Sequence, residues 1–579
     1  MNKELFFKNT QALFEVDQIL AYELRKLTNT QRFQLIDNKI FDIDNQVFLD
    51  KNHSFDFDKF ELYPVLFFYG FGDGEFFIEL LKNQHLKHIV IFEEELEILY
   101  LSFHLNDFTS FLRKEKLILF FIPNINTAQL NVLFNYPNIK YSVKIFNFHF
   151  YNEFYTNFYI EKANTLVQKL LNIIKTMVLS RGNDPKDALI GIKHNIINLE
   201  NIIMHTPFQF FLKEKKQKYK NVVIVSTGPS LIKQLPLLKK YQKNVIIFSV
   251  DSSYPILAKE GIKPDYVFSL EREEMTSEFF NNNFDDFDKD ILFIISSLTH
   301  PKTIQYLEKN NRNYMLVLRP LFFESKLGLK EYGFLGNGMS VANMAYELAG
   351  ALRFENIILI GQDLAYSDDG KSHPKEHLYG DQGDKEVIYK EITAYGGNKK
   401  VKTQLTWYLF LKSFEKDVAL AKDILKITTY NATEGGARIE GAIEKPFKEL
   451  CEELFLEKLD KQIFIKPNKD IVKKIKKCKE KLKQQVRQSE NFIKESHEAI
   501  NEKKLTKLQK LRVKIPKYDF FSDILQARYF QNECDVLKYK VQKEKDENLF
   551  LQNQIDFFKE IILYLEKYNE TISENLNKS

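Results

Sequence analysis

The feature that most constrains the fold is an alternation of short apolar runs and longer helical segments between residues 219 and 435. Six of these runs are rich in β-branched and aromatic residues and are expected to be strands: 221–225, 244–249, 266–270, 291–296, 314–318 and 356–360. Strands that alternate with helices are typical of a doubly wound parallel sheet. Such a sheet binds its ligands beyond the carboxyl ends of its strands, near the point where the strand order reverses. The sequence therefore predicts a Rossmann-like domain and the edge at which its site would lie.

The fold class expected for the whole chain is α/β, with four domains. They are an N-terminal α/β domain over residues 1–150, a helical connector over 151–218, the Rossmann-like domain over 219–440 and a helical bundle over 441–579. The bundle region is rich in Lys and Glu and has long helical patterns at 470–502 and 548–568. Its lysine run at 473–477 is interpreted as a solvated helix face, with an acidic or membrane partner as the alternative.

Composition and charge argue against several classes of protein. The 83 Lys and Arg residues nearly balance the 79 Asp and Glu residues, so a nucleic-acid partner held by bulk electrostatics is not expected. Cys451, Cys478 and Cys534 have no metal-ligand spacing, and reduced thiols are expected rather than a disulfide framework or a zinc site. The N-terminus lacks the pattern of a signal peptide, and no apolar run reaches the ~18 residues that span a bilayer. We therefore expect a cytoplasmic protein without membrane insertion.

The sharpest motif is the turn Thr227-Gly228-Pro229-Ser230, which follows the first expected strand of the central domain. Glycine permits a close approach, proline suits the first turn of a helix, and serine offers a hydroxyl. The N-terminus of a helix presents free N–H groups and a positive dipole to an anion. The turn is therefore interpreted as a phosphate site, and the alternative is an ordinary connection between a strand and a helix.

Acidic residues follow the next two expected strands. Asp251 lies where a βαβ unit often holds a ribose or base hydroxyl, and Glu271 follows the strand after it. The alternative role of Asp251 is that of a helix N-cap. Because three consecutive strands end in polar groups, these groups are expected to share one edge of the sheet.

Two later segments complete the expected site. Residues 336–340 form a glycine turn that opens a helix, and the strand at 356–360 ends at Gly361-Gln362-Asp363. The polar loop beyond it contains His373 and His377. Histidine suits general-base work because its unperturbed pKa is about 6.5. His373 is the candidate base, and the alternative is that both histidines are surface residues.

The carboxylates of the same loop allow a second interpretation. Asp363, Asp368 and Asp369 have the oxygen ligands that a divalent cation prefers. Their spacing does not distinguish a metal site from a polar loop.

A weaker motif lies in the N-terminal region. An expected strand ends in Gly70-x-Gly72-x-Gly74, a helical segment follows, and a second strand ends at Glu93. The pattern is that of a βαβ unit, and it resembles a site for a nucleotide or a methyl donor. It lacks the full dinucleotide fingerprint, so a structural turn is the favoured interpretation.

Several motifs together resemble a known family, the motility accessory factor (Maf) proteins implicated in glycosylating flagellin. The motifs are Thr227–Leu231, Ser249-Val-Asp251, Lys263-Pro-Asp265, Gly336–Ser340 and Gly361–Ser367, and they cover about 215 residues of the middle region. They are more distantly similar to bacterial sialyltransferases, which implies a sialyltransferase-type central domain. The resemblance to Maf proteins, of the pseudaminic-acid-transferring type, implies transfer of pseudaminic acid or a related nonulosonic acid from its CMP ester to Ser or Thr of flagellin, as needed for flagellum assembly and motility.

The resemblance also implies roles for single residues. Gly228, Pro229 and Ser230 would meet the CMP phosphate and ribose, Asp251 the nucleoside, and Asn337 and Ser340 the donor, while Asp363 would organise the acceptor side beside His373. Thr227 stands where the sialyltransferases have Asn. Further donor-binding residues are expected at Thr227, Glu271, Gln362 and Tyr366. Because CMP carries one phosphate, the donor substrate is expected to need no metal.

Two other functions remain open from the sequence. A flagellin-binding chaperone or assembly factor with an inactive site would suit the helical tail. Related middle domains resemble a pterin pyrophosphokinase, which would use ATP and magnesium. Nucleotide preference separates that enzyme from a CMP-sugar transferase.

Overall fold

The computed structural model describes residues 1–49, 55–179, 181–182, 184–336, 338–381, 387–462, 465–466, 468, 470–543 and 545–576. The chain forms two compact units. Unit 1 contains Met1–Asn183 and Leu525–Phe557, and unit 2 contains Asp184–Ile524 and Phe558–Ser579. Residues 525–557, from the expected helical bundle, thus belong to the N-terminal unit.

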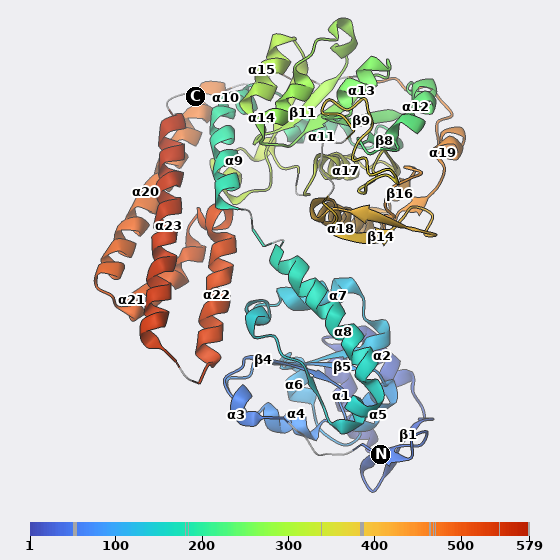
Figure 1. The fold of residues 1–579 in the computed structure, drawn as a ribbon, viewed down its shortest axis with the longest axis vertical. Coiled ribbons are helices and arrows are strands. Elements are labelled where there is room, and N and C mark those ends of the chain that lie inside the picture. The colour runs from blue at the N-terminus through green and yellow to red at the C-terminus, as the bar shows by residue number, and fades with distance from the viewer. Residues whose placement is uncertain are drawn as a thin grey trace. The chain divides into compact units, whose positions relative to one another are not determined.

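Unit 1 is built on a parallel sheet with the order β6-β5-β4-β7, of which Figure 1 labels β4 and β5. Its strands are β4 (Val65–Tyr69), β5 (His88–Glu93), β6 (Leu117–Phe121) and β7 (His149–Phe150). A separate antiparallel sheet contains β1 (Phe33–Ile36), β2 (Lys39–Asp42) and β3 (Val47–Phe48). The helices are α1 (Lys3–Phe14), α2 (Gln18–Lys26), α3 (Phe57–Phe60), α4 (Glu75–Leu80), α5 (Leu96–Ser102), α6 (Thr109–Arg113), α7 (Thr127–Asn135), α8 (Glu153–Leu179) and α22 (Gln526–Val541).

Unit 2 contains the predicted doubly wound sheet, with the order β12-β11-β10-β9-β8-β13-β16-β17. Its strands are β8 (Asn221–Val225), β9 (Ile246–Val250), β10 (Tyr266–Ser269), β11 (Leu292–Ser296), β12 (Asn313–Val317), β13 (Asn356–Ile360), β16 (Thr428–Asn431) and β17 (Ile443–Glu444). Neighbouring strands pair in parallel. The prediction of a parallel α/β sheet is therefore confirmed, with six strands found within two residues of their expected bounds.

Helices cover both faces of this sheet because successive side chains of a strand point to opposite sides. Val222 and Ile224 pack in one apolar cluster with Met344 of α17 (Val341–Ala351), and Val223 and Val225 pack in another with Leu238 of α12 (Leu235–Tyr241). The other helices of the sheet domain are α9 (Pro185–Ile197), α10 (Leu199–Met204), α11 (Phe208–Lys215), α13 (Tyr254–Lys259), α14 (Glu274–Ser277), α15 (Pro301–Lys309), α16 (Phe322–Leu327), α18 (Leu405–Leu420) and α19 (Phe447–Leu454). A hairpin, β14 (Lys390–Thr393) and β15 (Lys400–Thr403), lies apart from the sheet.

Long helices follow, as the sequence predicts. They are α20 (Ile471–Asn501), α21 (Leu505–Lys514) and α23 (Glu547–Leu576). Within unit 2, α20 and α23 lie side by side (Figure 1), and the Tyr568 hydroxyl donates to Gln485 Oε1 at 2.8 Å. Among the described residues, no helix is long and apolar enough to cross a membrane.

Candidate functional site

The predicted site residues gather where the strand order of the large sheet reverses. The chain runs outward from β8 through β9, β10, β11 and β12, and then returns to place β13 on the other side of β8. Parallel sheets of this kind bind ligands beyond the carboxyl ends of their strands at such a reversal. The turns that follow β8 and β13 therefore define the candidate site.

These two turns are joined by hydrogen bonds. The Ser230 N–H donates to Asp363 Oδ1 at 2.8 Å, and the Ser230 hydroxyl donates to Asp363 Oδ2 at 2.5 Å. Gly228 N–H donates to the carbonyl of Gly361 at 2.7 Å. A Cβ at Gly228 would lie 2.4 Å from Asp363 Oδ1. Glycine is thus required at 228 because the neighbouring turn approaches closely, and the carboxylate of Asp363 occupies the two donors that Ser230 was expected to offer to a phosphate.

The prediction that a helix begins at Pro229 is wrong. Ser230 precedes a single 3-10 turn, Leu231–Lys233, and α12 begins only at Leu235. Pro236 lies in the first turn of α12 and has no N–H to continue a helix from the preceding residues. The turn after β8 therefore presents a short 3-10 turn rather than the N-terminus of a continuous α-helix.

Asp363 is buried between these turns and the loop after β16. It is 3 % exposed, and burial raises its pKa to about 6, although the donors of Ser230 favour the ionised form. A Cβ at Gly436 would lie 2.3 Å from the Asp363 Cα. The carboxyl group is consequently held in one place by three segments that are far apart in the sequence.

Polar side chains also line the ends of β8, β9 and β10, as the sequence predicts. The hydroxyls of Thr227 and Ser252 are 2.5 Å apart, and Ser269 donates to Asp251 Oδ2 at 3.0 Å. Burial, followed by the charge of Glu271, raises the pKa of Asp251 to about 7. The N-cap of α13 is Ser253, so the alternative role of Asp251 as that cap is not observed.

Glu271 lies near two arginines at this edge. Burial raises its pKa, while the charges of Arg319 and Arg272 act in the opposite direction. Arg319 follows β12 and donates to the carbonyls of Gly336 at 2.8 Å and Gly338 at 3.1 Å. Arg319 is not among the predicted site residues, although it directly follows the expected strand at 314–318, as the other polar residues of this edge follow theirs.

His373 lies against the turn after β8. Its Nδ1 is 3.0 Å from the carbonyl oxygen of Thr227. Because a carbonyl only accepts, Nδ1 carries the proton, and the lone pair of a neutral ring is on Nε2. The ring stacks on His377 with centroids 4.1 Å apart. The structure thus brings the candidate base to the predicted edge, with a defined tautomer.

The remaining predicted residues have mainly structural contacts. Ser340 is the N-cap of α17, and its side chain accepts from the Asn343 N–H at 3.2 Å. Gln362 Oε1 accepts from the Ser226 hydroxyl at 2.6 Å, and the buried Tyr366 ring lies 4.6 Å from Trp407. Asn337 lies outside the described residues.

The three aspartates considered as metal ligands are not brought together. Asp368 pairs with Lys399 at 2.8 Å, and Asp369 pairs with Lys371 at 2.7 Å, whereas Asp363 is bound to Ser230. Within the part of the chain that the structure describes, no three His, Cys, Asp or Glu side chains are grouped to hold a metal ion.

The N-terminal glycine turn contains aromatic side chains where a ligand would approach. A Cβ at Gly70 would lie 2.4 Å from the Tyr155 ring, and one at Gly72 would lie 2.1 Å from the Tyr151 ring. Glu93 accepts from the Tyr155 hydroxyl at 2.6 Å and from the Phe71 N–H at 2.7 Å. The favoured interpretation of a structural turn agrees with this packing.

Comparisons with family models match two separate parts of the chain. Residues 5–178 match a family described as the glycosyltransferase Maf N-terminal domain, and residues 193–369 match one described as 6-hydroxymethylpterin diphosphokinase MptE-like. A solved structure of a Maf glycosyltransferase from Magnetospirillum magneticum AMB-1 aligns with a TM-score of 0.60 at 16% identity, over 100% of this chain and 99% of that chain. No curated protein matches the chain.

Proposed function

We propose that this chain, which is similar to the Maf glycosyltransferases over residues 5–178 and in its fold, is itself a glycosyltransferase of that family and transfers a sugar at the edge where β8, β9 and β13 end. The observation that carries the proposal is the placement of His373 Nδ1 3.0 Å from the Thr227 carbonyl, beside the Ser230–Asp363 pair. This places a base with its lone pair on Nε2 at the edge that also holds the hydroxyls of Thr227 and Ser252, whereas Asp363 takes both donors of Ser230. Such a set can accept a proton and stabilise a leaving phosphate.

The donor we propose is the CMP ester of a nonulosonic acid, of which pseudaminic acid is the first candidate. Asp251, with its pKa near 7, and the Thr227 hydroxyl are suited to the hydroxyls of a nucleoside. The similarity of residues 5–178 to the Maf N-terminal domain supports a sugar donor. Flagellin is the proposed acceptor, through its Ser or Thr hydroxyls, in the cytoplasm, and transfer would serve flagellum assembly and motility.

These groups account for the bond that forms, the bond that breaks and the proton that is released in the transfer. The acceptor hydroxyl forms a bond to the anomeric carbon while the bond from that carbon to the CMP phosphate oxygen breaks. His373 takes the hydroxyl proton on Nε2, and CMP leaves with both electrons of the broken bond. Because CMP has a single phosphate, we propose that no metal clamp is needed.

A second candidate function is diphosphoryl transfer. It is favoured by the match of residues 193–369 to a pterin diphosphokinase-like family, which includes the turn after β8, Asp251 and Asp363. This enzyme would bind ATP with magnesium, in contrast to the metal-independent transferase. Nucleotide binding therefore distinguishes the two candidates.

The decisive experiment incubates the full chain with flagellin and CMP-pseudaminic acid, with and without EDTA, and measures the mass of intact flagellin. A gain of whole sugar units that His373→Ala abolishes is the expected result. Lys375→Ala, in the same loop, is the matched control and should retain transfer. Binding of flagellin without any mass gain would instead indicate an assembly factor, and dependence on ATP and magnesium would indicate the diphosphokinase.

A further inference from the structure

His377 lies beside His373 in a compact loop that follows β13. The loop closes on itself, because the Ser372 N–H donates to the carbonyl of Asp381 at 2.9 Å and the Ser372 hydroxyl donates to the same oxygen at 3.2 Å. Within the loop, the His377 N–H donates to the carbonyl of Pro374 at 3.1 Å. Loops whose ends meet in this way pack their own side chains together. The two histidines are therefore held in one closed loop.

His377 is a packed residue of this loop and is only 8 % exposed. Its ring lies against that of Phe279, with centroids 5.5 Å apart, and its Nδ1 accepts from the Tyr379 N–H at 3.3 Å. Phe279 is itself buried, and the Tyr379 hydroxyl donates to the carbonyl of Met275 in α14 at 2.5 Å. These contacts fasten the loop to the segment that follows β10, so the ring of His377 is a fixed surface.

The ring of His377 lies face to face with the ring of His373. The two centroids are 4.1 Å apart, and the ring planes differ by 17°. Rings this close and this nearly parallel leave His373 no room to turn toward His377. On its edge, His373 is held by the bond from Nδ1 to the carbonyl oxygen of Thr227 at 3.0 Å. The His373 ring is consequently restrained on one edge and on one face.

A bond at Nδ1 alone does not fix the direction of the lone pair on Nε2. The torsion that turns a histidine ring about its Cβ–Cγ bond is broad, so a ring can rock about a single hydrogen bond. The lone pair lies in the ring plane and changes direction as the ring rocks. A general base must lie within hydrogen-bond reach of the proton that it takes, and a small misplacement lowers the rate steeply. The stack on His377 supplies the second restraint.

The charge of His377 also suits this role. Its Nδ1 accepts from a backbone N–H and so carries no proton, which makes the ring neutral. His373 becomes a cation when it takes the proton of the acceptor hydroxyl. A neutral ring 4.1 Å away adds no like charge to that cation, whereas a protonated neighbour would oppose its formation.

We propose that His377 is a positioning residue, whose stacked ring fixes the plane of His373 and so aims the Nε2 lone pair at the acceptor hydroxyl. The inference rests on the proposed function, because it takes His373 as the base for sugar transfer. His377 acts through His373 and needs no contact with the donor or the acceptor.

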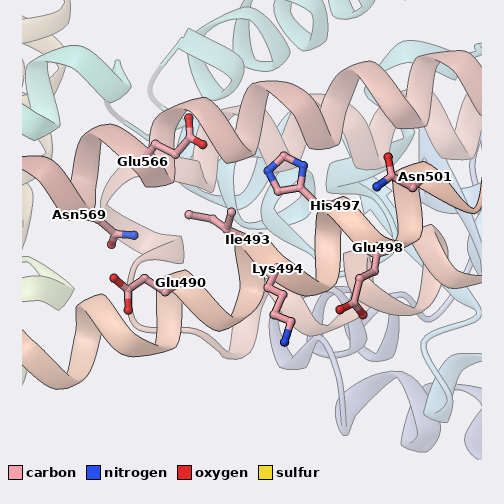
Figure 2. Close-up of a pocket in the computed structure, with 8 residues that line it drawn as sticks. All are labelled: Glu490, Ile493, Lys494, His497, Glu498, Asn501, Glu566 and Asn569. Carbon is pink, nitrogen blue, oxygen red and sulfur yellow. The ribbon is translucent and has the colours of Figure 1, made fainter.

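A histidine elsewhere in unit 2 has a different setting. His497 of α20 lines a shallow pocket of about 560 Å³, where Figure 2 shows it among side chains such as Lys494, Glu566 and Asn569. The described residues that line this pocket with it carry no aromatic ring. His497 therefore serves as a control for the loss of an imidazole that positions no other group.

Two substitutions at one position isolate the effect of the flat ring. His377→Phe and His377→Leu both fill the site with apolar atoms and both lose the bond from the Tyr379 N–H, but only phenylalanine presents a flat face to His373. With flagellin and CMP-pseudaminic acid, His377→Leu should lower kcat by about tenfold and change KM for the donor by less than about twofold, because the chemical step is affected and binding is not. His377→Phe should retain kcat within about threefold.

His205 is the matched control for the stack. Its ring lies 4.0 Å from that of Tyr314, and its Nδ1 is 2.8 Å from the carbonyl oxygen of Asn201. Because Tyr314 is near the start of β12, this histidine lies at the opposite edge of the sheet from the candidate site. His205→Leu and His497→Leu should each change kcat by less than about twofold.

A second measurement needs no substrate. In the full chain labelled with ¹⁵N in its histidine rings, the signals of His373 are identified by their loss in His373→Ala. At about pH 8 they should show a proton on Nδ1 and none on Nε2. His377→Leu should mix the two tautomers, and His377→Phe should preserve the single one.

The outcomes separate this inference from the proposed function. Equal values of kcat in the Phe and Leu variants, or a His373 tautomer that His377→Leu leaves unchanged, overturn the inference alone. A natural chain that transfers no sugar overturns the proposed function and the inference together.

Discussion

Both units contain a glycine turn after a parallel strand, and the two turns differ in what packs against the glycines. In unit 1, the rings of Tyr151 and Tyr155 fill the space beside Gly70 and Gly72. In unit 2, the carboxyl group of Asp363 lies beside Gly228. The first turn is sealed by aromatic side chains, whereas the second is surrounded by groups that bind protons and hydroxyls. The same local pattern therefore serves packing in one unit and, as we propose, chemistry in the other.

The largest expected effect is on the rate of sugar transfer, and it distinguishes Asp363, beside the turn of unit 2, from Glu93, beside the turn of unit 1. Asp363→Asn should lower kcat/KM for sugar transfer by about 10²–10³-fold, because an amide cannot accept from both donors of Ser230. Glu93→Gln should change it by less than about threefold. Initial rates with CMP-sugar check both values. Equal losses of kcat/KM in the two variants would contradict the assignment of packing to the turn of unit 1 and chemistry to the turn of unit 2.

The next largest effect concerns the fit of the aromatic rings in unit 1. Gly72→Ala should destabilise β4 and β5 by about 3–5 kcal/mol, because Gly72 has φ +57° and the added Cβ would lie 2.1 Å from the Tyr151 ring. Hydrogen exchange of amides in these strands measures the change. Gly350→Ala, inside α17, is the control and should stabilise its helix by up to about 1 kcal/mol. Unchanged protection in β4 would show that the rings can move aside.

The pH dependence of the stability of β5 is expected to be a somewhat smaller effect. Burial raises the pKa of Glu93 from 4.5 to about 7. Between these values the folded chain keeps a proton that the unfolded chain releases, so stability is highest below pH 4.5 and declines as the pH rises to about 7. The loss is about 3 kcal/mol in the free energy of opening β5. Hydrogen exchange across this range should show the slope, and Glu93→Gln should remove it. A slope that persists in this variant would assign it to another group.

The smallest expected effect comes from a single hydroxyl. Tyr155 accepts from the Gly72 N–H at 3.1 Å and donates to Glu93. Tyr155→Phe leaves both partners buried without it, and should cost about 1–3 kcal/mol in thermal or chemical unfolding of unit 1. Tyr159→Phe removes a less buried bond to Glu95 and should cost less than about 1 kcal/mol. A larger loss from the control would show that Tyr155 does not anchor the turn.

The sequence predicts much of the sheet because its strands carry their own signals. β8 and β13 have the expected bounds, and β9 is displaced by two residues at its start. No strand was expected at β16. This strand is short, and its residues Thr428-Thr-Tyr-Asn431 are mostly polar. Apolar patterning thus locates the strands that are apolar, the edge strand β12 included, and misses a short strand of mostly polar residues such as β16.

The sequence predicted which strand ends form the candidate site. It did not predict the hydrogen bonds between the residues of the site. Ser230 and Asp363 are 133 residues apart, and no local pattern shows that the carboxylate takes both donors of the serine. Tyr155 reaches the N-terminal turn from 83 residues beyond Gly72. Which side chain fills a turn is decided by packing between distant segments, and a single sequence does not display it.

Unit 1 is built from two segments that are far apart in the sequence, and this has a consequence for the synthesis of the chain. α22 packs against residues near Lys144, which pairs with Asp535 across 391 residues, and Tyr141 contacts Phe530. At about 5–20 residues per second, roughly 20–80 s pass between the emergence of these two segments from a ribosome. During that interval the aromatic surface around Tyr141 lacks its cover and is available to molecular chaperones. The unit that is translated first is thus among the last to be completed, and a stop codon before residue 525 would leave it unfinished.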